Sequence, residues 1–94
     1  MYALQNTIMS DNSRLFAKIE NKSLSKNLIK KIPTQNEIRL YKGSLKKYTW
    51  ADFNYQDETI SIFSGTGDLM LFVENPDCSE NILNELLDVF IEEC

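Results

Sequence analysis

The stretch LMLFVENPDCSENILNELLDVFI, residues 69–91, decides the fold. It begins with five consecutive apolar residues, 69–73, a pattern typical of a strand in the middle of a sheet. An Asn-Pro pair ends this strand, and the next residues fit a capping box with Asp77 as the N-cap and Glu80 three positions later, although Ser79 is a competing cap. The following helix carries an apolar stripe of Ile82, Leu83, Leu86, Leu87 and Phe90. The stretch therefore predicts a central strand followed by an amphipathic helix.

Shorter patterns upstream predict further strands and one more helix. Residues 2–9 can pair with residues 14–20 across the turn-forming residues 10–13. Alternation within 14–20 divides the side chains between two faces, with Leu15, Ala17 and Ile19 on one and Arg14, Phe16, Lys18 and Glu20 on the other. A short helix is expected between Ser23 and Pro33. Residues 38–42, 46–55 and 59–64 indicate additional strands, and Gly65 to Gly67 a turn.

These elements predict an α+β fold, because strands come in consecutive runs with one helix inserted and another at the end. We expect one domain over residues 1–94, with a mainly antiparallel sheet of about five to six strands. The short inserted helix and the amphipathic C-terminal helix complete it, the latter packed on one face. The longest apolar run, residues 69–73, is far shorter than the ~20 residues of a membrane-spanning helix. We therefore expect a cytoplasmic protein without membrane contact.

The charges are divided unevenly along the chain. The 94 residues have a formal net charge of −4. Residues 1–47 hold all ten basic residues and three acids, a balance of +7, whereas residues 48–94 hold eleven acids and no base, a balance of −11. Two opposed charged surfaces would steer a charged partner, whereas two interleaved halves would neutralise each other. The sequence leaves both arrangements open.

The residue types present exclude several kinds of catalysis. The chain has no histidine, which removes Ser-His-Asp and Cys-His mechanisms and imidazole metal sites. Its two cysteines, Cys78 and Cys94, cannot form a zinc centre alone and are expected to be free thiols. Asp11 with Glu20-Asn21-Lys22 resembles in form the Asp…Glu-x-Lys arrangement of metal-dependent nucleases, an alternative carried by three residues only. We assign no catalytic, cofactor or metal residue and expect a protein that is not an enzyme.

Two groups of residues are candidates for binding another protein. The first is an acidic stripe on the C-terminal helix, formed by Glu85, Asp88 and Glu92. The second is an aromatic strand that contributes Tyr48, Trp50 and Tyr55. Tyr48 and Trp50 share one face of that strand and Phe53 and Tyr55 the other, so at least one aromatic pair should be partly exposed. These features predict a module that binds a basic protein, such as an acidic inhibitor or immunity-type antagonist.

Other partners remain open at this point. A subunit or assembly factor of a larger complex would show the same features, and a second copy of the chain could supply the basic surface. The main alternative is nucleic-acid binding through the basic half, with Lys26, Lys30, Lys42, Lys46 and Lys47 as candidate phosphate contacts. The calculated pI of about 4.7 argues against it, because nucleic-acid binders usually have a basic balance.

Overall fold

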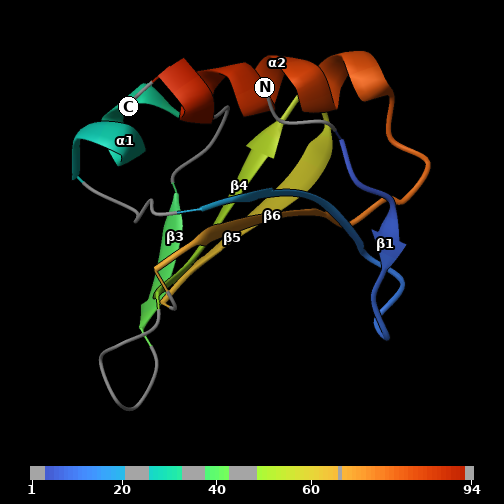
Figure 1. Ribbon diagram of the computed structural model, residues 1–94, viewed down its shortest axis with the longest axis horizontal. Coiled ribbons are helices and arrows are strands. Elements are labelled where there is room, and N and C mark those ends of the chain that lie inside the picture. Colours follow the sequence, from blue (N-terminus) through green and yellow to red (C-terminus); the bar gives the residue numbers. More distant parts are fainter. Residues whose placement is uncertain (1–3, 21–25, 33–37, 43–48, 66, 93–94) are drawn as a thin grey trace.

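In the part of the chain that the structure describes, the fold consists of a six-stranded antiparallel sheet and two helices (Figure 1). The computed structural model describes residues 4–20, 26–32, 38–42, 49–65 and 67–92. The strands are β1 (Thr7–Ile8), β2 (Arg14–Ile19), β3 (Arg39–Lys42), β4 (Thr49–Tyr55), β5 (Glu58–Ser64) and β6 (Leu69–Val73). The helices are α1 (Lys26–Lys31) and α2 (Glu80–Glu92). The predicted α+β fold class is confirmed.

The strand order is β1-β2-β6-β5-β4-β3, and every neighbouring pair is antiparallel. β3 to β6 follow one another as a meander, whereas β2 lies beside β6, which is far from it in the sequence. β4 and β5 join through Gln56 and Asp57, which have φ values of 48° and 65°, as a two-residue hairpin turn requires. The uninterrupted apolar strand β6 is thus paired on both sides, as its composition predicts.

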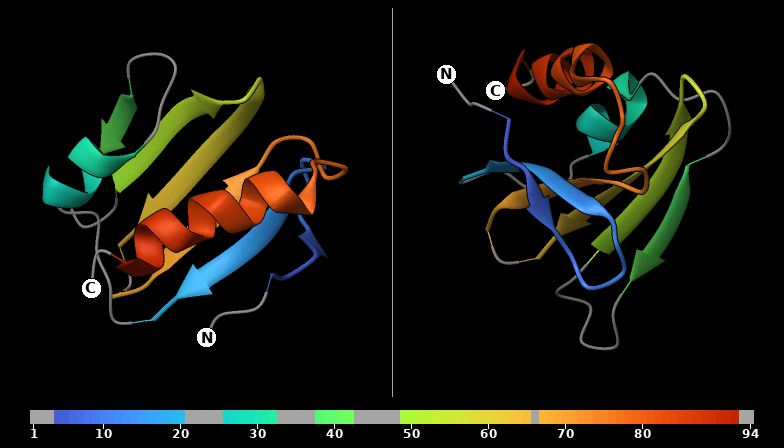
Figure 2. Two further views of the ribbon diagram at one scale, coloured as in Figure 1. Left: turned by 90° about the horizontal axis from the view of Figure 1, so that it is seen from above. Right: turned by 90° about the vertical axis from the view of Figure 1, so that its right-hand side faces the viewer.

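Both helices lie on the same side of the sheet (Figure 2). The α2 stripe is buried there, with Leu83, Leu86, Leu87 and Phe90 at most 2% exposed. Ser79 is the N-cap: its Oγ accepts a hydrogen bond from the Asn81 amide at 3.3 Å, and its carbonyl accepts from Leu83. Of the two caps that the sequence left open, Ser79 is therefore the one used, because the helix begins at Glu80, two positions later than a cap at Asp77 requires. Neither described helix is long and apolar enough to cross a membrane.

A bulge in β2 overturns the predicted alternation of that strand. The pairing with β6 shifts between Leu15 and Ala17, so Phe16 is the extra residue. Phe16 is fully buried in the core, whereas regular alternation placed it with Lys18 on the polar face. Arg14, also placed on that face, is only 5% exposed. A one-residue insertion changes the face of a side chain, and simple period-two counting does not detect it.

Candidate functional site

The sheet has one face covered by the helices and one face that no described helix covers. On β4, Ala51 and Phe53 are fully buried with the helix residues in the core, whereas Trp50 is 39% exposed. The expectation of a partly exposed aromatic on this strand is confirmed for Trp50. We call the uncovered side the open face. It is unusual in carrying large apolar side chains where a solvated sheet normally carries polar ones.

Three aromatic rings from three adjacent strands form a cluster on the open face. The Trp50 ring centroid lies 4.8 Å from that of Phe63 on β5 and 5.7 Å from that of Phe72 on β6. These distances are typical of favourable aromatic pairs. The register explains the cluster, because Trp50 is directly opposite Phe63, and Phe63 is opposite Met70, two residues from Phe72. The cluster therefore depends on strand pairing and not on any local motif.

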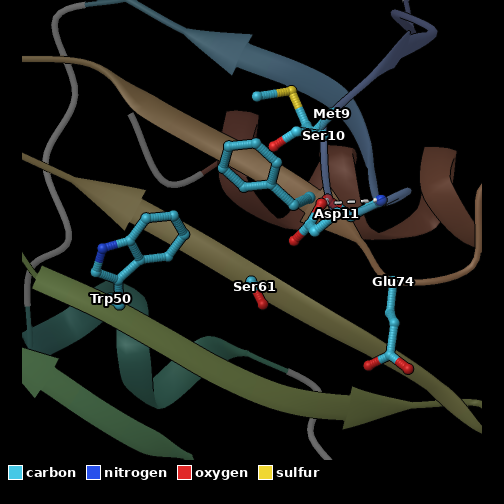
Figure 3. Close-up of a pocket in the computed structure, with 8 residues that line it drawn as sticks. Met9, Ser10, Asp11, Trp50, Ser61 and Glu74 are labelled. Atoms are coloured by element: carbon cyan, nitrogen blue, oxygen red, sulfur yellow. Dashed lines mark hydrogen bonds between the residues drawn. The ribbon is translucent and has the colours of Figure 1, made fainter.

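A pocket of about 320 Å³ lies beside this cluster (Figure 3). It lies between the sheet and the turn that joins β1 to β2. Its lining consists of Met9, Ser10, Asp11, Ser13, Trp50, Ser61, Phe72 and Glu74. Met9 is itself 39% exposed. The lining thus combines an apolar wall with three serines and two carboxylates, and none of its described residues is basic.

Local hydrogen bonds hold Asp11 in its place at the pocket. Its Oδ1 accepts from the Ser13 hydroxyl at 2.6 Å and from the Ser13 amide at 3.0 Å. The Ser13 side-chain bond, followed by the backbone bond, lowers the pKa of Asp11 below its ordinary value. The φ of 70° at Asn12 gives the turn the shape that these bonds require. Asp11 is therefore a charged carboxylate at neutral pH.

Glu74 connects this pocket with an acidic end of the molecule. It follows β6, and its amide donates to the Thr59 carbonyl at 2.9 Å. A second depression of about 390 Å³ adjoins it, lined by Asp57, Glu58, Thr59, Glu74, Asn75 and Pro76. Within the described ranges, no group of three or more acids or cysteines is arranged to hold a metal ion. Glu74, two positions after Phe72, therefore adds a carboxylate to the border of the open face, whereas Glu58 is opposite Tyr55 and belongs to the helix side.

The acidic stripe of α2 lies on the opposite side of the sheet from Trp50. Its Glu85 is engaged within the molecule: Oε2 accepts from the Tyr55 hydroxyl at 2.5 Å and from Gln56 Nε2 at 3.1 Å. The Glu85 hydrogen bond raises the pKa of Tyr55. Asp88 is exposed. Glu92 is the last residue of α2, and its side chain is not among those that the structure describes.

The predicted aromatic strand does not form one surface. Trp50 is on the open face, whereas Tyr55 packs against the core on the helix side and reaches Glu85. Tyr48 lies outside the described residues. The structure thus brings together one residue of each predicted group, Tyr55 and Glu85, in a contact that links the β4–β5 hairpin to α2.

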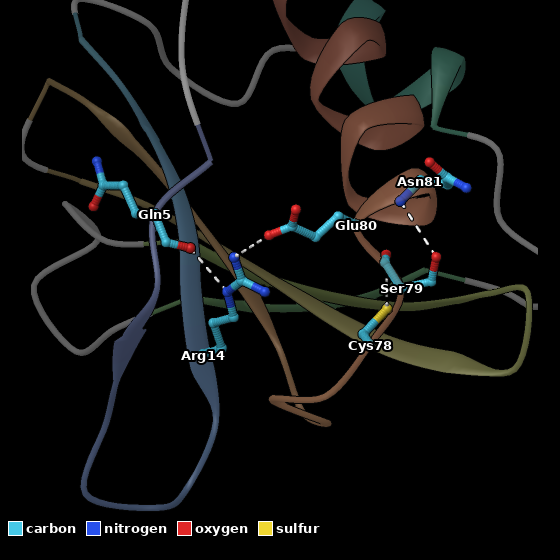
Figure 4. Close-up of polar contacts among 6 residues, drawn as sticks. All are labelled: Gln5, Arg14, Cys78, Ser79, Glu80 and Asn81. Carbon is cyan, nitrogen blue, oxygen red and sulfur yellow. Dashed lines mark hydrogen bonds and ion pairs between the residues drawn. The ribbon is translucent and has the colours of Figure 1, made fainter.

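Ion pairs join the basic and acidic halves of the chain. Arg14 donates from Nε to the Gln5 carbonyl at 2.8 Å, and its terminal nitrogen is 3.4 Å from Glu80 (Figure 4). Lys18 Nζ is 3.6 Å from Asp68. Because β2 lies beside β6, bases of the first half meet acids of the second. In this part of the fold the two halves interleave.

Of the lysines predicted for nucleic-acid binding, the structure describes the side chain of Lys30. Lys30 is exposed on α1, on the helix side of the sheet and away from the aromatic cluster. Lys26 and Lys42 belong to α1 and β3, with side chains outside the description, and Lys46 and Lys47 lie outside the described residues. Lys30 and Trp50 therefore do not share the mixed basic and aromatic surface that the alternative requires.

The two remaining chemical candidates lack the necessary geometry. Asp11 precedes β2 and Glu20 follows it, so the strand's rise of about 3.3 Å per residue separates them by roughly 20 Å. They cannot bind one metal ion together, and Lys22 lies outside the described residues. Cys78 is 5% exposed, and its burial, followed by the charge of Glu58, raises the pKa of the thiol to about 11. Such a thiol is a poor nucleophile at neutral pH.

None of the protein-family models, curated proteins and solved structures compared with this chain matches it. The candidate site therefore rests on its own geometry. Sequence reasoning identified Trp50 but missed its neighbours Phe63, Phe72, Asp11 and Glu74 as members of one site. A signal existed for Phe63 in the alternation of residues 59–64, whereas the continuous apolar run of 69–73 concealed the outward direction of Phe72.

Proposed function

We propose that this protein is a small binding module that is not an enzyme and that uses the open face of its sheet to bind a basic protein in the cytoplasm. The observation that supports this most directly is the exposed Trp50, packed on Phe63 and Phe72 where no described helix covers the sheet. A tryptophan held in one orientation by its neighbours loses little conformational freedom on binding and offers a large area to a partner. Trp is among the residues most enriched at binding hot spots.

The charge of the surrounding surface indicates the sign of the partner. Asp11 and Glu74 border the aromatic cluster, and Asp57 in the β4–β5 turn lines a depression next to Glu74. A basic partner would be attracted to this border and would then cover the apolar rings. An inhibitor or immunity-type antagonist that covers a basic site of an enzyme or toxin would work in this way. A subunit of a larger complex would use the same surface.

Capture of partners from a lysate of the native organism, followed by affinity measurement with the purified partner, tests the proposal. Trp50→Thr keeps a β-branched residue suited to the strand, and Glu74→Lys reverses one border charge at an exposed position. Asp88→Lys is the matched control, because it makes the same type of charge reversal on α2. Circular dichroism establishes that each variant is folded.

We expect the first two variants to lose a basic partner that Asp88→Lys retains. For the purified complex, Trp50→Thr should weaken affinity by about 30-fold or more, the effect of a hot-spot residue worth ~2 kcal/mol. Retention of the partner by Trp50→Thr together with its loss by Asp88→Lys would move the site to α2 and refute the proposal. Self-association that Trp50→Thr abolishes would replace the basic partner with a second copy of the chain.

Nucleic-acid binding is tested on the same variants with a single-stranded oligonucleotide. If nucleobases stacked on Trp50, nearby lysine or arginine side chains would be needed to contact the phosphates. The pocket beside Trp50 presents carboxylates instead. We expect no binding at low salt. Affinity that falls steeply with added salt and is lost in the Lys46→Glu/Lys47→Glu variant would establish the nucleic-acid alternative and overturn the protein-binding proposal.

A further inference from the structure

We infer that the pocket beside Trp50 accepts an arginine side chain of the basic partner. This inference rests on the proposed function and specifies its central contact. The pocket is lined by the aromatic rings of Trp50 and Phe72 and by two carboxylates, and Ser10, Ser13 and Ser61 complete its polar lining. A guanidinium group carries a delocalised charge on a flat surface, so it can use both kinds of wall at once.

The aromatic part of the wall suits a flat cation. The rings of Trp50 and Phe72 are tilted by only 32° to each other, with their centroids 5.7 Å apart. Trp50 is packed against Phe63 and yet remains 39% exposed, so part of the indole surface is available while its position is held. Cations bind favourably over the face of an indole ring, and arginine does so more often than lysine. The aliphatic part of the same side chain can contact Met9 and Phe72.

The carboxylates supply the complementary charge from two separate segments. Asp11 comes from the turn between β1 and β2, and Glu74 from the end of β6. Both Ser13 bonds to Asp11 end on Oδ1 and not on the second carboxylate oxygen, Oδ2. An incoming guanidinium can donate to this oxygen while the Ser13 bonds stay intact. The same carboxylates disfavour a phosphate or carboxylate ligand.

The size of the pocket is adequate for this occupant. About 320 Å³ corresponds to roughly ten water molecules at ~30 Å³ each, which is room for a side chain and some bridging water. The three serine hydroxyls can donate to or accept from such water. Release of water from the rings accompanies entry of the side chain, which favours binding. A lysine would keep the charge contact but lose the planar stacking and the forked set of donors.

Titration with N-acetylarginine amide tests the inference on the intact protein. Trp50 is the single tryptophan of the chain, so its fluorescence reports directly on the pocket. N-acetylcitrulline amide has nearly the same shape without the charge, and N-acetyllysine amide has the charge without the planar group. Backbone NMR shifts provide a second readout that locates the binding site.

We expect saturable binding of the arginine compound in the millimolar range, with shifts centred on Trp50, Phe72 and the β1–β2 turn. The citrulline compound should bind at least about tenfold more weakly, and the lysine compound with intermediate affinity. Asp11→Asn and Glu74→Gln should each weaken arginine binding by about threefold or more, whereas the control Asp88→Asn should leave it unchanged. Equal binding of arginine and citrulline compounds, or shifts centred elsewhere, would overturn the inference.

The two proposals can fail separately. If the arginine compound does not bind while partner capture still depends on Trp50, the open face is a binding surface and the arginine pocket is refuted. If the arginine compound binds but partner capture is unaffected by Trp50→Thr, the pocket stands as a cation site and the proposed function is refuted.

Discussion

Tyr55→Phe removes the hydroxyl that joins the β4–β5 hairpin to α2. In the native protein this hydroxyl donates to Glu85 Oε2 at 2.5 Å. A hydrogen bond to a charged acceptor contributes about 1.5–3 kcal/mol at its strongest, but Glu85 is exposed and exchanges this bond for one with water. We therefore expect the variant to lower the free energy of unfolding by about 1 kcal/mol at pH 8, since Phe preserves the ring's packing on the core.

The effect should depend on pH in a defined direction. The Glu85 bond raises the pKa of Tyr55 above its ordinary value of 10.0, so the folded protein holds the phenolic proton more tightly than the unfolded chain. The stabilisation is fully present below about pH 10 and is lost as the pH rises through the folded-state pKa. The difference between the wild type and Tyr55→Phe should thus be constant from pH 7 to 9 and shrink above pH 10.

Urea denaturation followed by circular dichroism measures these free energies without relying on Trp50 fluorescence. A double-mutant cycle with Glu85→Ala supplies the control, because Tyr55→Phe should have almost no effect once the acceptor is gone. A coupling free energy below ~0.2 kcal/mol would show that the contact is not made in solution. A stability difference that grows above pH 10 would contradict the stated direction of the pKa shift. Either result would also mean that Tyr55 does not engage the Glu85 carboxylate, which could then contact a partner together with the rest of the acidic stripe.

Two further predictions concern buried groups. In a Cys94→Ser variant, Cys78 should react with a thiol reagent at pH 8 about 50-fold or more slowly in the native state than in urea. The reason is that burial and a pKa of about 11 leave little thiolate in the folded protein. Equal rates in the two states would show that this thiol is accessible. Phe16→Ala should lower the free energy of unfolding by about 3–5 kcal/mol, as measured by urea denaturation. Leu15→Ala, beside the bulge, should cost about 1–2 kcal/mol because this side chain is only partly buried; similar losses at both positions would contradict the bulge.

Local periodicity predicted most of the secondary structure. The apolar stripe of α2 repeats with the helical period, and its Leu83, Leu86, Leu87 and Phe90 are buried as expected. The continuous apolar run of 69–73 became the strand β6, paired on both sides. The N-cap, left open between Asp77 and Ser79, and the bulge at Phe16, which alternation missed, each involve a shift of one or two residues. Such shifts depend on how neighbouring segments pack, and the periodicity of one segment does not contain that information.

The candidate site was predictable only in part. Alternation along β4 is enough to separate Trp50 from Phe53, and it correctly required an exposed aromatic. The grouping of Trp50 with Tyr55 as one binding strand did not follow from that alternation, and the structure places them on opposite faces. The acidic stripe was derived from helical spacing alone, which cannot show that Tyr55 and Gln56 already occupy Glu85.

By itself, the sequence determined the α+β class, the amphipathic C-terminal helix, the absence of histidine chemistry and the uneven division of charge along the chain. Only the tertiary structure decided what that division means. β2 pairs with β6, some fifty positions later, and this pairing brings Lys18 to Asp68 and Arg14 near Glu80. The same pairing brings the turn of Asp11 beside the aromatic cluster. Contacts between distant segments depend on which strand edges meet, because hydrophobic pattern specifies the buried face of a strand but not its neighbour.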